Sequence, residues 1–519
     1  MRVSAALVAL IATALVLFGG ASSSAASAAS PQYANPVFAG AHPDPSVLRV
    51  GDVFWATSTS NQFAPLFPLM KSTDLVNWRL VGSIFPRPPA WSDGRYWAPE
   101  LARMGGRFVV FYSARKRGGA LCVASAVASR PQGPWTDRGP LVCQPVGSLD
   151  AFPIKDENGR WQLLWKEERN AVGESTPIWA APLSGDGGRI IGPQRELIRN
   201  EASWEGQLVE GPAVVRRAGW FYLFYSAGDC CTSECDYRVG VARSRTLTGR
   251  WRKNPANPVL VGSERFQCPG HGTVLEHGGR YYFLYHAVRD PVVGREMLLD
   301  RVRFTRGWPA IGTGRPSEAA PSPLGARQRP LARSLRDEFA SLSPRWGWPL
   351  DADPQTVIDP LGGGGVVLRA NGGAALLDSG VLATRTLTAN WTATAATDPG
   401  TLGPGAHSGV AATRLLRDQR EGVGVAVGDG RVVMWVHRET GPELVVGARQ
   451  LNTRGPVELE LSRRGTSFTA RFRPVGGAWT RLGEAIDGSF LASMRIGLTV
   501  GGVAGATARF ERFTLVPSG

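Results

Sequence analysis

Five polar residues recur at matching places in the chain, each inside or beside a short apolar segment. They are Asp44, Glu100, Asp150, Glu210 and His271, and each precedes a glycine by six to nine residues. Several carboxyl groups in one pocket perturb each other, because burial and like charge raise the pKa of one while another stays ionised. Such a pair can supply a general acid and a general base, the chemistry that cleaves a glycosidic bond. The sequence therefore predicts an acid–base site where these residues meet.

The glycines that follow these polar residues each begin an aromatic, strand-like run. Runs rich in Phe, Tyr, Trp and Val are typical of strands buried on both faces. Five all-β repeats of 50–60 residues predict a five-bladed β-propeller. Because the first strand of each blade lines the central axis, the five polar residues are expected to converge at one end of it. The runs are Gly51–Thr59, Gly106–Ala114, Gly159–Glu167, Gly219–Ala227 and Gly279–Ala287, with steps of 55, 53, 60 and 60 residues.

A polar residue at a crowded axis can also serve only to satisfy backbone groups, and this structural role is the expectation for Glu100. Four acidic groups and one histidine in register are poorly explained in that way, because burying charges close together is costly. The carboxyl separation, about 6.5–9.5 Å in inverting and about 5–5.5 Å in retaining glycosidases, does not follow from sequence. Other hydrolytic chemistries fit less well, since the chain has no G-x-S-x-G, H-E-x-x-H or Walker motif.

The 519 residues divide into four predicted segments. Residues 1–29 have the basic start, apolar stretch and A-x-A sequence of a signal peptide, with a signal anchor as the alternative. Residues 33–314 carry the propeller repeats, and residues 315–333 form a linker rich in Pro, Ala and Arg. Residues 334–518 contain short strand-like runs between glycine turns, which predicts a β-sandwich. The expected fold class is therefore all-β, in a secreted, extracellular protein.

The charge of the chain is strongly positive, with 58 Lys and Arg against 43 Asp and Glu, or +15. Almost all of the cations are arginines, and they form no long run, so nucleic-acid binding is not expected. After the predicted signal peptide no stretch has about 18 consecutive apolar residues, so membrane insertion is not expected either. The chain is expected to be a monomer whose partner is a polysaccharide or oligosaccharide substrate.

All six cysteines lie between residues 122 and 268. Export favours disulfides over free thiols. A zinc site is the alternative, but Cys-Cys-x3-Cys is not a usual zinc spacing. A disulfide at Cys268 could tie its loop to the axis, because His271 lies three residues further on. The expected pairing is Cys122 with Cys143, and Cys230, Cys231, Cys235 and Cys268 among themselves.

Taken in order, several motifs resemble those of glycoside hydrolase family 43 over about residues 35–310: NPVFAGAHPDPSVL, YWAPEL, SLDAFPI, VEGPAVV, PGHGTVL and YYFLYHA. The resemblance implies a five-bladed propeller and an inverting mechanism. It implies that Asp44 is the general base that activates water and that Glu210 is the general acid. It further implies that Asp150 tunes the pKa of that acid and orients it.

The same resemblance suggests further site residues. His271 matches an axial histidine that in some members helps to hold calcium or another ion, so a structural Ca²⁺ near the propeller axis is a candidate; the alternative is a hydrogen-bonded structural histidine. No cofactor is expected to be required. Apart from the resemblance, Trp91 and Trp97 are candidates for stacking on sugar, because an aromatic face suits the apolar side of a sugar ring, or else for packing. Arg289, just after the fifth aromatic run, is a candidate for contact with substrate hydroxyls. The Cys230-Cys231-x3-Cys235 insert is not general to the family.

The leading expectation is an exo-acting, inverting glycosidase on arabinose- or xylose-containing plant polysaccharide, of α-L-arabinofuranosidase or β-xylosidase type. Three alternatives remain: a galactofuranosidase, a retaining furanosidase of the fructan-acting kind, and a propeller that binds sugar without catalysis. The C-terminal sequence DEFASLSPRWGWP resembles the start of concanavalin-like sandwich domains appended to family 43 propellers. Such a domain could bind polysaccharide, contribute to the active site or only pack against the propeller.

Overall fold

The computed structural model describes residues 31–231, 235–358, 364–371, 376, 380–416, 419–439, 441–453 and 455–518. Within these ranges the regular elements are strands and three short 3₁₀ helices, η1 (Arg169–Val172), η2 (Ser203–Glu205) and η3 (Pro399–Thr401). The all-β prediction is confirmed. The predicted signal peptide, residues 1–29, lies outside the described residues, and within them no helix is long and apolar enough to cross a membrane.

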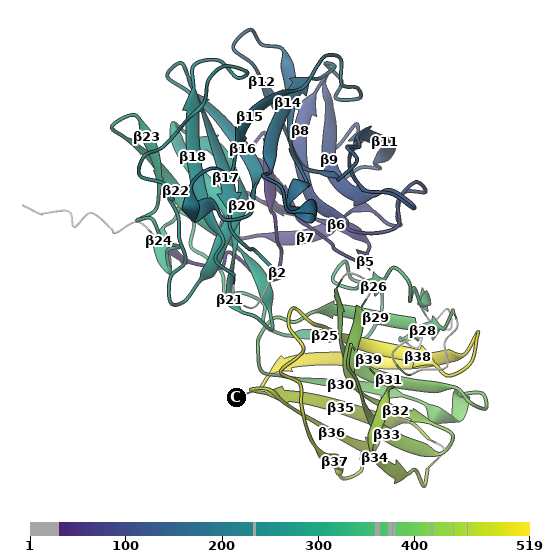
Figure 1. The fold of residues 1–519 in the computed structure, drawn as a ribbon. Helices are drawn as coiled ribbons and strands as arrows, with labels where there is room; N and C mark the ends of the chain where they lie inside the picture. The colour runs from purple at the N-terminus through teal and green to yellow at the C-terminus, as the bar shows by residue number, and fades with distance from the viewer. Residues whose placement is uncertain are drawn as a thin grey trace, which may run out of the picture.

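Residues 38–311 form five antiparallel sheets around a common axis, which confirms the five-bladed propeller (Figure 1). The first strands of neighbouring sheets contact one another, so they line this axis. Strand β2 (Phe38–Ala41), from the start of the chain, pairs with β22 of the last sheet and closes the ring. From the axis outward the sheets are β3 (Ser46–Val50), β4 (Val53–Thr57), β6 (Leu66–Ser72) and β7 (Arg79–Phe85); β8 (Trp97–Met104), β9 (Arg107–Arg115), β10 (Leu121–Ala128) and β11 (Thr136–Val142); β12 (Ser148–Lys155), β13 (Trp161–Glu167), β14 (Pro177–Pro182) and β15 (Arg195–Arg199); β16 (Val209–Arg217), β17 (Trp220–Ala227), β18 (Arg238–Ser244) and β19 (Arg252–Lys253); and β20 (Gln267–His277), β21 (Arg280–Asp290), β22 (Gly294–Thr305) and β23 (Trp308–Ile311).

The five aromatic runs are the second strands of the five blades: β4, β9, β13, β17 and β21. Each lies between its own neighbours in the sheet and packs between adjacent blades, so both faces are buried, as predicted. Burial of a large side chain contributes about 1.5–3 kcal/mol. The aromatic strands therefore hold the blades, and with them the axial strands, in fixed positions.

The axial strands are distorted where their polar residues stand. The ladder register shifts beside Glu100, Asp150, Glu210 and His271, as expected for β-bulges. Asp150 and His271 also have positive φ angles of 60° and 38°. A bulge re-aims a side chain that would otherwise follow the strict alternation of the strand. The distortions therefore direct these polar groups toward the axis.

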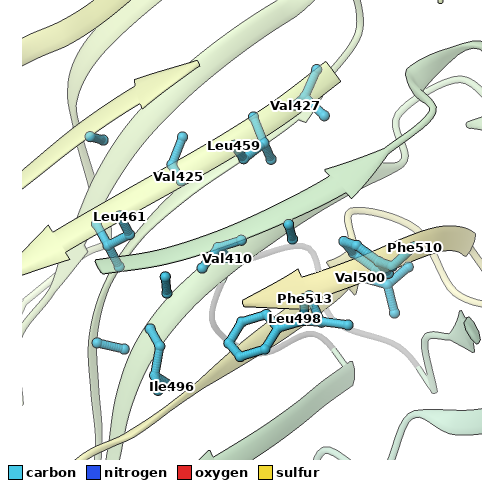
Figure 2. Packing of buried hydrophobic residues seen from close by; sticks show 14 of the residues in the cluster. Val410, Val425, Val427, Leu459, Leu461, Ile496, Leu498, Val500, Phe510 and Phe513 are labelled. Atoms are coloured by element: carbon cyan, nitrogen blue, oxygen red, sulfur yellow. The ribbon is translucent and has the colours of Figure 1, made fainter. Parts of the chain in front are cut away.

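Most of residues 335–517 form two packed antiparallel sheets, which confirms the β-sandwich. Figure 2 shows valines, leucines and phenylalanines from both sheets meeting in its core. One sheet contains β27 (Gln355–Ile358), β28 (Val366–Arg369), β39 (Thr507–Pro517), β30 (Trp391–Thr397), β35 (Val457–Arg464), β36 (Ser467–Pro474) and β37 (Thr480–Asp487), with β25 (Leu335–Asp337) beside β39; the other contains β29 (Gly380–Arg385), β38 (Arg495–Gly501), β31 (His407–Leu416), β32 (Gln419–Gly428), β33 (Arg431–His437) and β34 (Leu444–Gln450).

The sandwich is attached to the propeller by backbone pairing. β26 (Trp348–Pro349) pairs with β5 (Phe63–Ala64) of the first blade (Figure 1). The segment predicted as a linker, residues 315–333, contains a short strand, β24 (Ala319–Pro321), which pairs with β1 (Gln32–Ala34). The segment just before the propeller is therefore paired with the segment just after it.

Candidate active site

Asp44 stands just before the first axial strand and has four polar neighbours. Its Oδ2 accepts a hydrogen bond from the Thr59 hydroxyl at 2.6 Å, and its Oδ1 lies 3.0 Å from an Arg295 nitrogen. Nδ1 of His286 and Nδ1 of His271 lie 3.2 and 3.5 Å from the same Oδ1. Burial favours the neutral acid, but Arg295 and the two imidazoles outweigh it and hold the pKa of Asp44 well below its ordinary value. Asp44 is therefore an ionised carboxylate at neutral pH.

Asp150 lies near the same ring nitrogen of His271 that faces Asp44. Its Oδ2 is 3.8 Å from His271 Nδ1 and accepts a hydrogen bond of 2.9 Å from the backbone N–H of Gly211. Burial, with Glu210 and Asp44 adding like charge, raises the pKa of Asp150 to about 7, against the opposing effect of His271 and Lys166. This carboxyl therefore holds a proton close to neutral pH.

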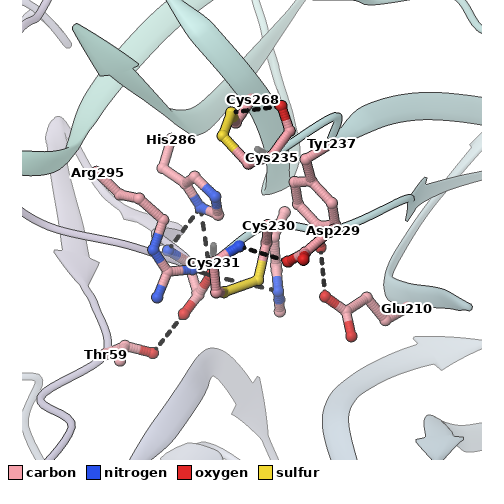
Figure 3. The surroundings of a disulfide bond; sticks show 12 residues. Thr59, Glu210, Asp229, Cys230, Cys231, Cys235, Tyr237, Cys268, His286 and Arg295 are labelled. Atoms are coloured by element: carbon pink, nitrogen blue, oxygen red, sulfur yellow. Dashed lines mark hydrogen bonds and ion pairs between the residues drawn. A yellow bond between two sulfur atoms is a disulfide. The ribbon is translucent and has the colours of Figure 1, made fainter. Parts of the chain in front are cut away.

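Glu210 precedes Gly211, so the backbone links it directly to Asp150. Its Oε2 lies 2.9 Å from Nζ of Lys166, and its Oε1 accepts a 2.7 Å hydrogen bond from the Tyr237 hydroxyl (Figure 3). Burial raises the pKa of Glu210, but Lys166 and the Tyr237 hydrogen bond lower it more, so that the net shift is downward. The proton of the Asp150–Glu210 pair is therefore on Asp150.

The predicted convergence of polar residues is confirmed for four of the five. Asp44, Asp150 and Glu210 come from three blades and meet around His271 of a fourth, whose ring leaves no room for a side chain at Gly211: a Cβ there would lie 2.9 Å from it. Glu100 is elsewhere along the axis. It accepts a hydrogen bond of 3.0 Å from the Thr273 hydroxyl, and burial raises its pKa to about 8. These contacts fit the structural role expected of it.

The predicted aromatic and arginine contacts have these surroundings. Trp97 pairs with Ser113, whose hydroxyl accepts the N–H of Asp150, so it stands beside the carboxyl cluster. Trp91 donates its indole N–H to Asp137 at 3.1 Å. Arg289 lies 3.0 Å from the buried Glu296, while Arg295, six residues later, contacts Asp44. Sugar contacts of Trp91, Trp97 and Arg289 stay predictions.

The predicted calcium ion requires suitable ligands. Ca²⁺ takes about 6–8 oxygen ligands, and His271 offers a nitrogen that already faces Asp44 and Asp150. Among the described residues no group of three His, Cys, Asp or Glu side chains could hold a metal ion. An ion at His271 therefore stays a prediction, and nothing below depends on it.

Three disulfides account for the six cysteines. Cys122 is bonded to Cys143, as predicted, and the remaining four pair among themselves as Cys230–Cys231 and Cys235–Cys268. The second and third lie near Tyr237, which immediately precedes β18 (Figure 3). The Cys235–Cys268 bond ties the segment before Tyr237 to the axial strand of His271. It therefore fixes two elements of the site to each other.

Five residues of this site were absent from the sequence-based predictions: Thr59, Lys166, Tyr237, His286 and Arg295. Lys166 carried a usable signal, because it is a cation directly after Leu163, Leu164 and Trp165 in the third run. His286 carried a similar signal, because it is a polar residue directly after Phe283, Leu284 and Tyr285 in the fifth run. Tyr237, just before β18, and Arg295, in β22, had no such signal, because they reach the carboxylates from outside the axial strands.

The comparisons with known proteins agree with this architecture. The xylosidase/arabinosidase 43B of Humicola insolens is 29% identical over 290 residues, 52% of this chain and 52% of that protein. The non-reducing end alpha-L-arabinofuranosidase BoGH43B of Bacteroides ovatus is 28% identical over 308 residues, 55% and 54% of the two chains. The chain thus spans about half the length of these curated relatives.

Among solved structures, the GH43 protein BlXynB of Bacillus licheniformis superposes with a TM-score of 0.78 at 22% identity, over 94% of this chain and 100% of that one. This likeness shows the fold of both the propeller and the sandwich. The family model of the glycosyl hydrolases family 43 matches residues 33–309, more than half of the chain. The chain therefore belongs to glycosyl hydrolases family 43.

Proposed function

We propose that the protein is a secreted, inverting exo-glycosidase that removes arabinose or xylose from plant polysaccharide. The observation that carries this proposal is the series of contacts from Asp44 through His271 and Asp150 to the backbone of Gly211, the residue after Glu210. These contacts join the carboxyl groups of Asp44, Asp150 and Glu210, which differ in protonation, in one pocket. The names of the relatives, xylosidases and arabinofuranosidases, support the sugar class. Three disulfides, the signal-like residues 1–29 and an extracellular arabinofuranosidase relative from Cellvibrio japonicus support secretion.

Asp44 is the proposed general base. A base must be ionised before the reaction, and Arg295, Thr59 and the two histidines stabilise the carboxylate. It takes a proton from a water molecule that attacks the anomeric carbon, while the glycosidic bond to the leaving oxygen breaks. The negative charge of Asp44 also stabilises the cationic transition state.

Glu210 is the proposed general acid, and it acts with Asp150 as a coupled pair. The pair holds one proton near neutrality, and Lys166 keeps that proton off Glu210 in the free enzyme. Glu210 must therefore receive the proton before it can pass it to the leaving oxygen. Asp150 supplies it, and after the transfer the charge of Asp150 keeps the pKa of Glu210 from falling further.

The coupled pair predicts the high-pH limit of activity. The value of kcat/KM should fall as the pH rises through about 7, because the pair then loses the proton that the leaving group needs. In Asp150→Asn the like charge is absent, so Lys166 lowers the pKa of Glu210 unopposed and the limb should move to lower pH. Measuring kcat/KM against pH for both proteins tests this. An unmoved limb in Asp150→Asn would contradict the coupling.

The stereochemical outcome tests the mechanism as a whole. Aryl arabinofuranosides, xylosides and galactofuranosides are incubated with the full chain, and the product anomer is followed by proton NMR before it mutarotates. We expect turnover of an arabinofuranoside or a xyloside with inversion. Retention would contradict the inverting assignment and favour the fructan-type alternative. Turnover of galactofuranosides alone would replace arabinose or xylose by galactofuranose as the assigned substrate sugar. No turnover of any of them would favour a binding propeller.

A further inference from the structure

Two arginines stand directly opposite each other where the sandwich meets the propeller. Arg385, the last residue of β29, is the register partner of Arg495, the first residue of β38. Directly opposed residues of an antiparallel pair extend from the same face of the sheet, and two like charges in this position are destabilising. An arrangement that brings these two cations together needs a compensating negative charge.

Among the described residues, no carboxylate forms an ion pair or a hydrogen bond with either guanidinium. Arg495 instead lies over the ring of Phe63, 3.8 Å from its centroid. Both side chains are half-buried, and β2 lies so close that a Cβ on Gly40 would be 3.4 Å from the Cβ of Arg385. Burial lowers the pKa of Arg385 to about 10, which reflects how poorly its charge is compensated.

A third guanidinium and a cavity complete the arrangement. Arg345 and Arg385 line a cavity of about 420 Å³ between β2, the first blade and the sandwich, and His42 lines it too. Burial, and then the charges of Arg385, Arg495 and Arg345, lower the pKa of His42. Arg495 is not part of the described lining, but it is the register partner of Arg385, which is. Asp74 is the one carboxylate in the described lining, and it accepts the backbone N–H groups of its own turn.

This cationic cavity adjoins the candidate active site. His42 is two residues before Asp44 along the chain. Arg495 lies over the ring of Phe63, which is in β5. This strand follows Thr59 by a few residues, and the Thr59 hydroxyl donates to Asp44. The cavity and the carboxylate site therefore share the short segment from His42 to Asp44.

We propose that Arg345, Arg385 and Arg495 form an oxyanion-binding site at the junction of the propeller and the sandwich. Guanidinium groups bind carboxylate and phosphate oxygens in pairs of parallel hydrogen bonds. The oxyanion can come from the carboxylate of an acidic sugar on the polysaccharide or from an inorganic anion, and the sugar source rests on the proposed function. The sandwich then has a binding role, because it provides all three arginines.

Thermal unfolding of the full chain tests this site without any need for activity. The probes are D-glucuronate, inorganic phosphate and, as the neutral control, D-glucose, in a buffer low in other anions. A ligand that binds only the folded state raises the Tm, by about 2–4 °C for each kcal/mol in a domain of 150–250 residues. We expect a rise of this size with an oxyanion and none with D-glucose.

Three variants make the result specific. Arg385→Gln and, as a second test at the opposing position, Arg495→Gln should lose the rise. Without added anion both should unfold at or above the wild-type temperature, because they remove the repulsion between the opposed guanidiniums. Arg464→Gln, an exposed arginine of the same sandwich, should keep the rise. Near-UV circular dichroism establishes that each variant is folded.

Each outcome decides a point. A rise with D-glucuronate at lower concentration than with phosphate assigns the site to an acidic sugar, and a rise with phosphate alone assigns it to an inorganic anion. No rise with either, or an equal rise in Arg385→Gln, overturns the site. A protein that shows the rise but hydrolyses no glycoside would contradict the proposed function and leave the oxyanion site standing.

Discussion

Replacing Glu210 by Gln should lower kcat on arabino- or xylo-oligosaccharides by about 10²–10⁴, the range typical of lost general acid catalysis. The amide has the size of the carboxyl group and can still accept the Tyr237 hydrogen bond at its oxygen, but it has no proton to give to a leaving sugar oxygen. The loss should depend on the leaving group. A dinitrophenolate departs without protonation, so the same variant should lose far less activity on dinitrophenyl glycosides.

Two comparisons isolate the acid role of Glu210. Glu201→Gln changes an exposed carboxylate in a nearby loop and should retain wild-type rates on both substrates. Lys166→Met removes the cation that holds the proton off Glu210, so it should shift the pH profile upward rather than change the dependence on leaving group. Equal losses of Glu210→Gln on poor and good leaving groups would contradict the acid assignment.

The blades could be predicted because their signal is local and repeated. Each aromatic run is a central strand whose two faces are buried, so its composition alone marks it, and a polar residue in the adjoining axial strand stands out against apolar neighbours. Asp44, Asp150, Glu210 and His271 were found in this way. The bulges and positive φ angles that turn these side chains toward one another have no comparable signal.

The partners of the carboxylates were harder to predict, since they depend on pairing between strands. Arg289 was chosen because it follows the fifth aromatic run, but across the β21–β22 hairpin it meets Glu296. Arg295 adjoins Glu296 in the same strand and so extends to the opposite face, toward Asp44. This alternation could have been applied to either arginine once the hairpin register was known, and the sequence does not give that register.

The protonation of the pair was left open by the sequence. Like charge and burial were expected to raise the pKa of one carboxyl group, without an indication of which one. Lys166 decides this, because it contacts Glu210 and leaves Asp150 as the group that keeps the proton. In the proposed mechanism, Asp150 therefore serves as the proton reservoir of the pair in addition to tuning the acid.

Replacing Asp44 by Ala should remove the base and lower kcat by about 10²–10⁴ on every substrate, whatever its leaving group. This uniform loss distinguishes the base from the acid, because an undeprotonated water is a poor nucleophile however well the other oxygen departs. The vacated volume next to Arg295 and His271 can admit a small anion, since Arg295 loses its carboxylate partner and His271 loses one of two.

Azide should therefore restore turnover of Asp44→Ala on a dinitrophenyl glycoside, because an anionic nucleophile needs no base. The product should be the glycosyl azide of inverted configuration, identified by proton NMR, since azide attacks from the side on which water is activated. Loss of the Asp44 carboxylate leaves Arg295 without its partner, so near-UV circular dichroism must first establish that the variant is folded, with Asp44→Asn as the isosteric comparison. A folded variant that azide does not rescue, or that gives the retained azide, would contradict the role of Asp44 as the base on the attacking side.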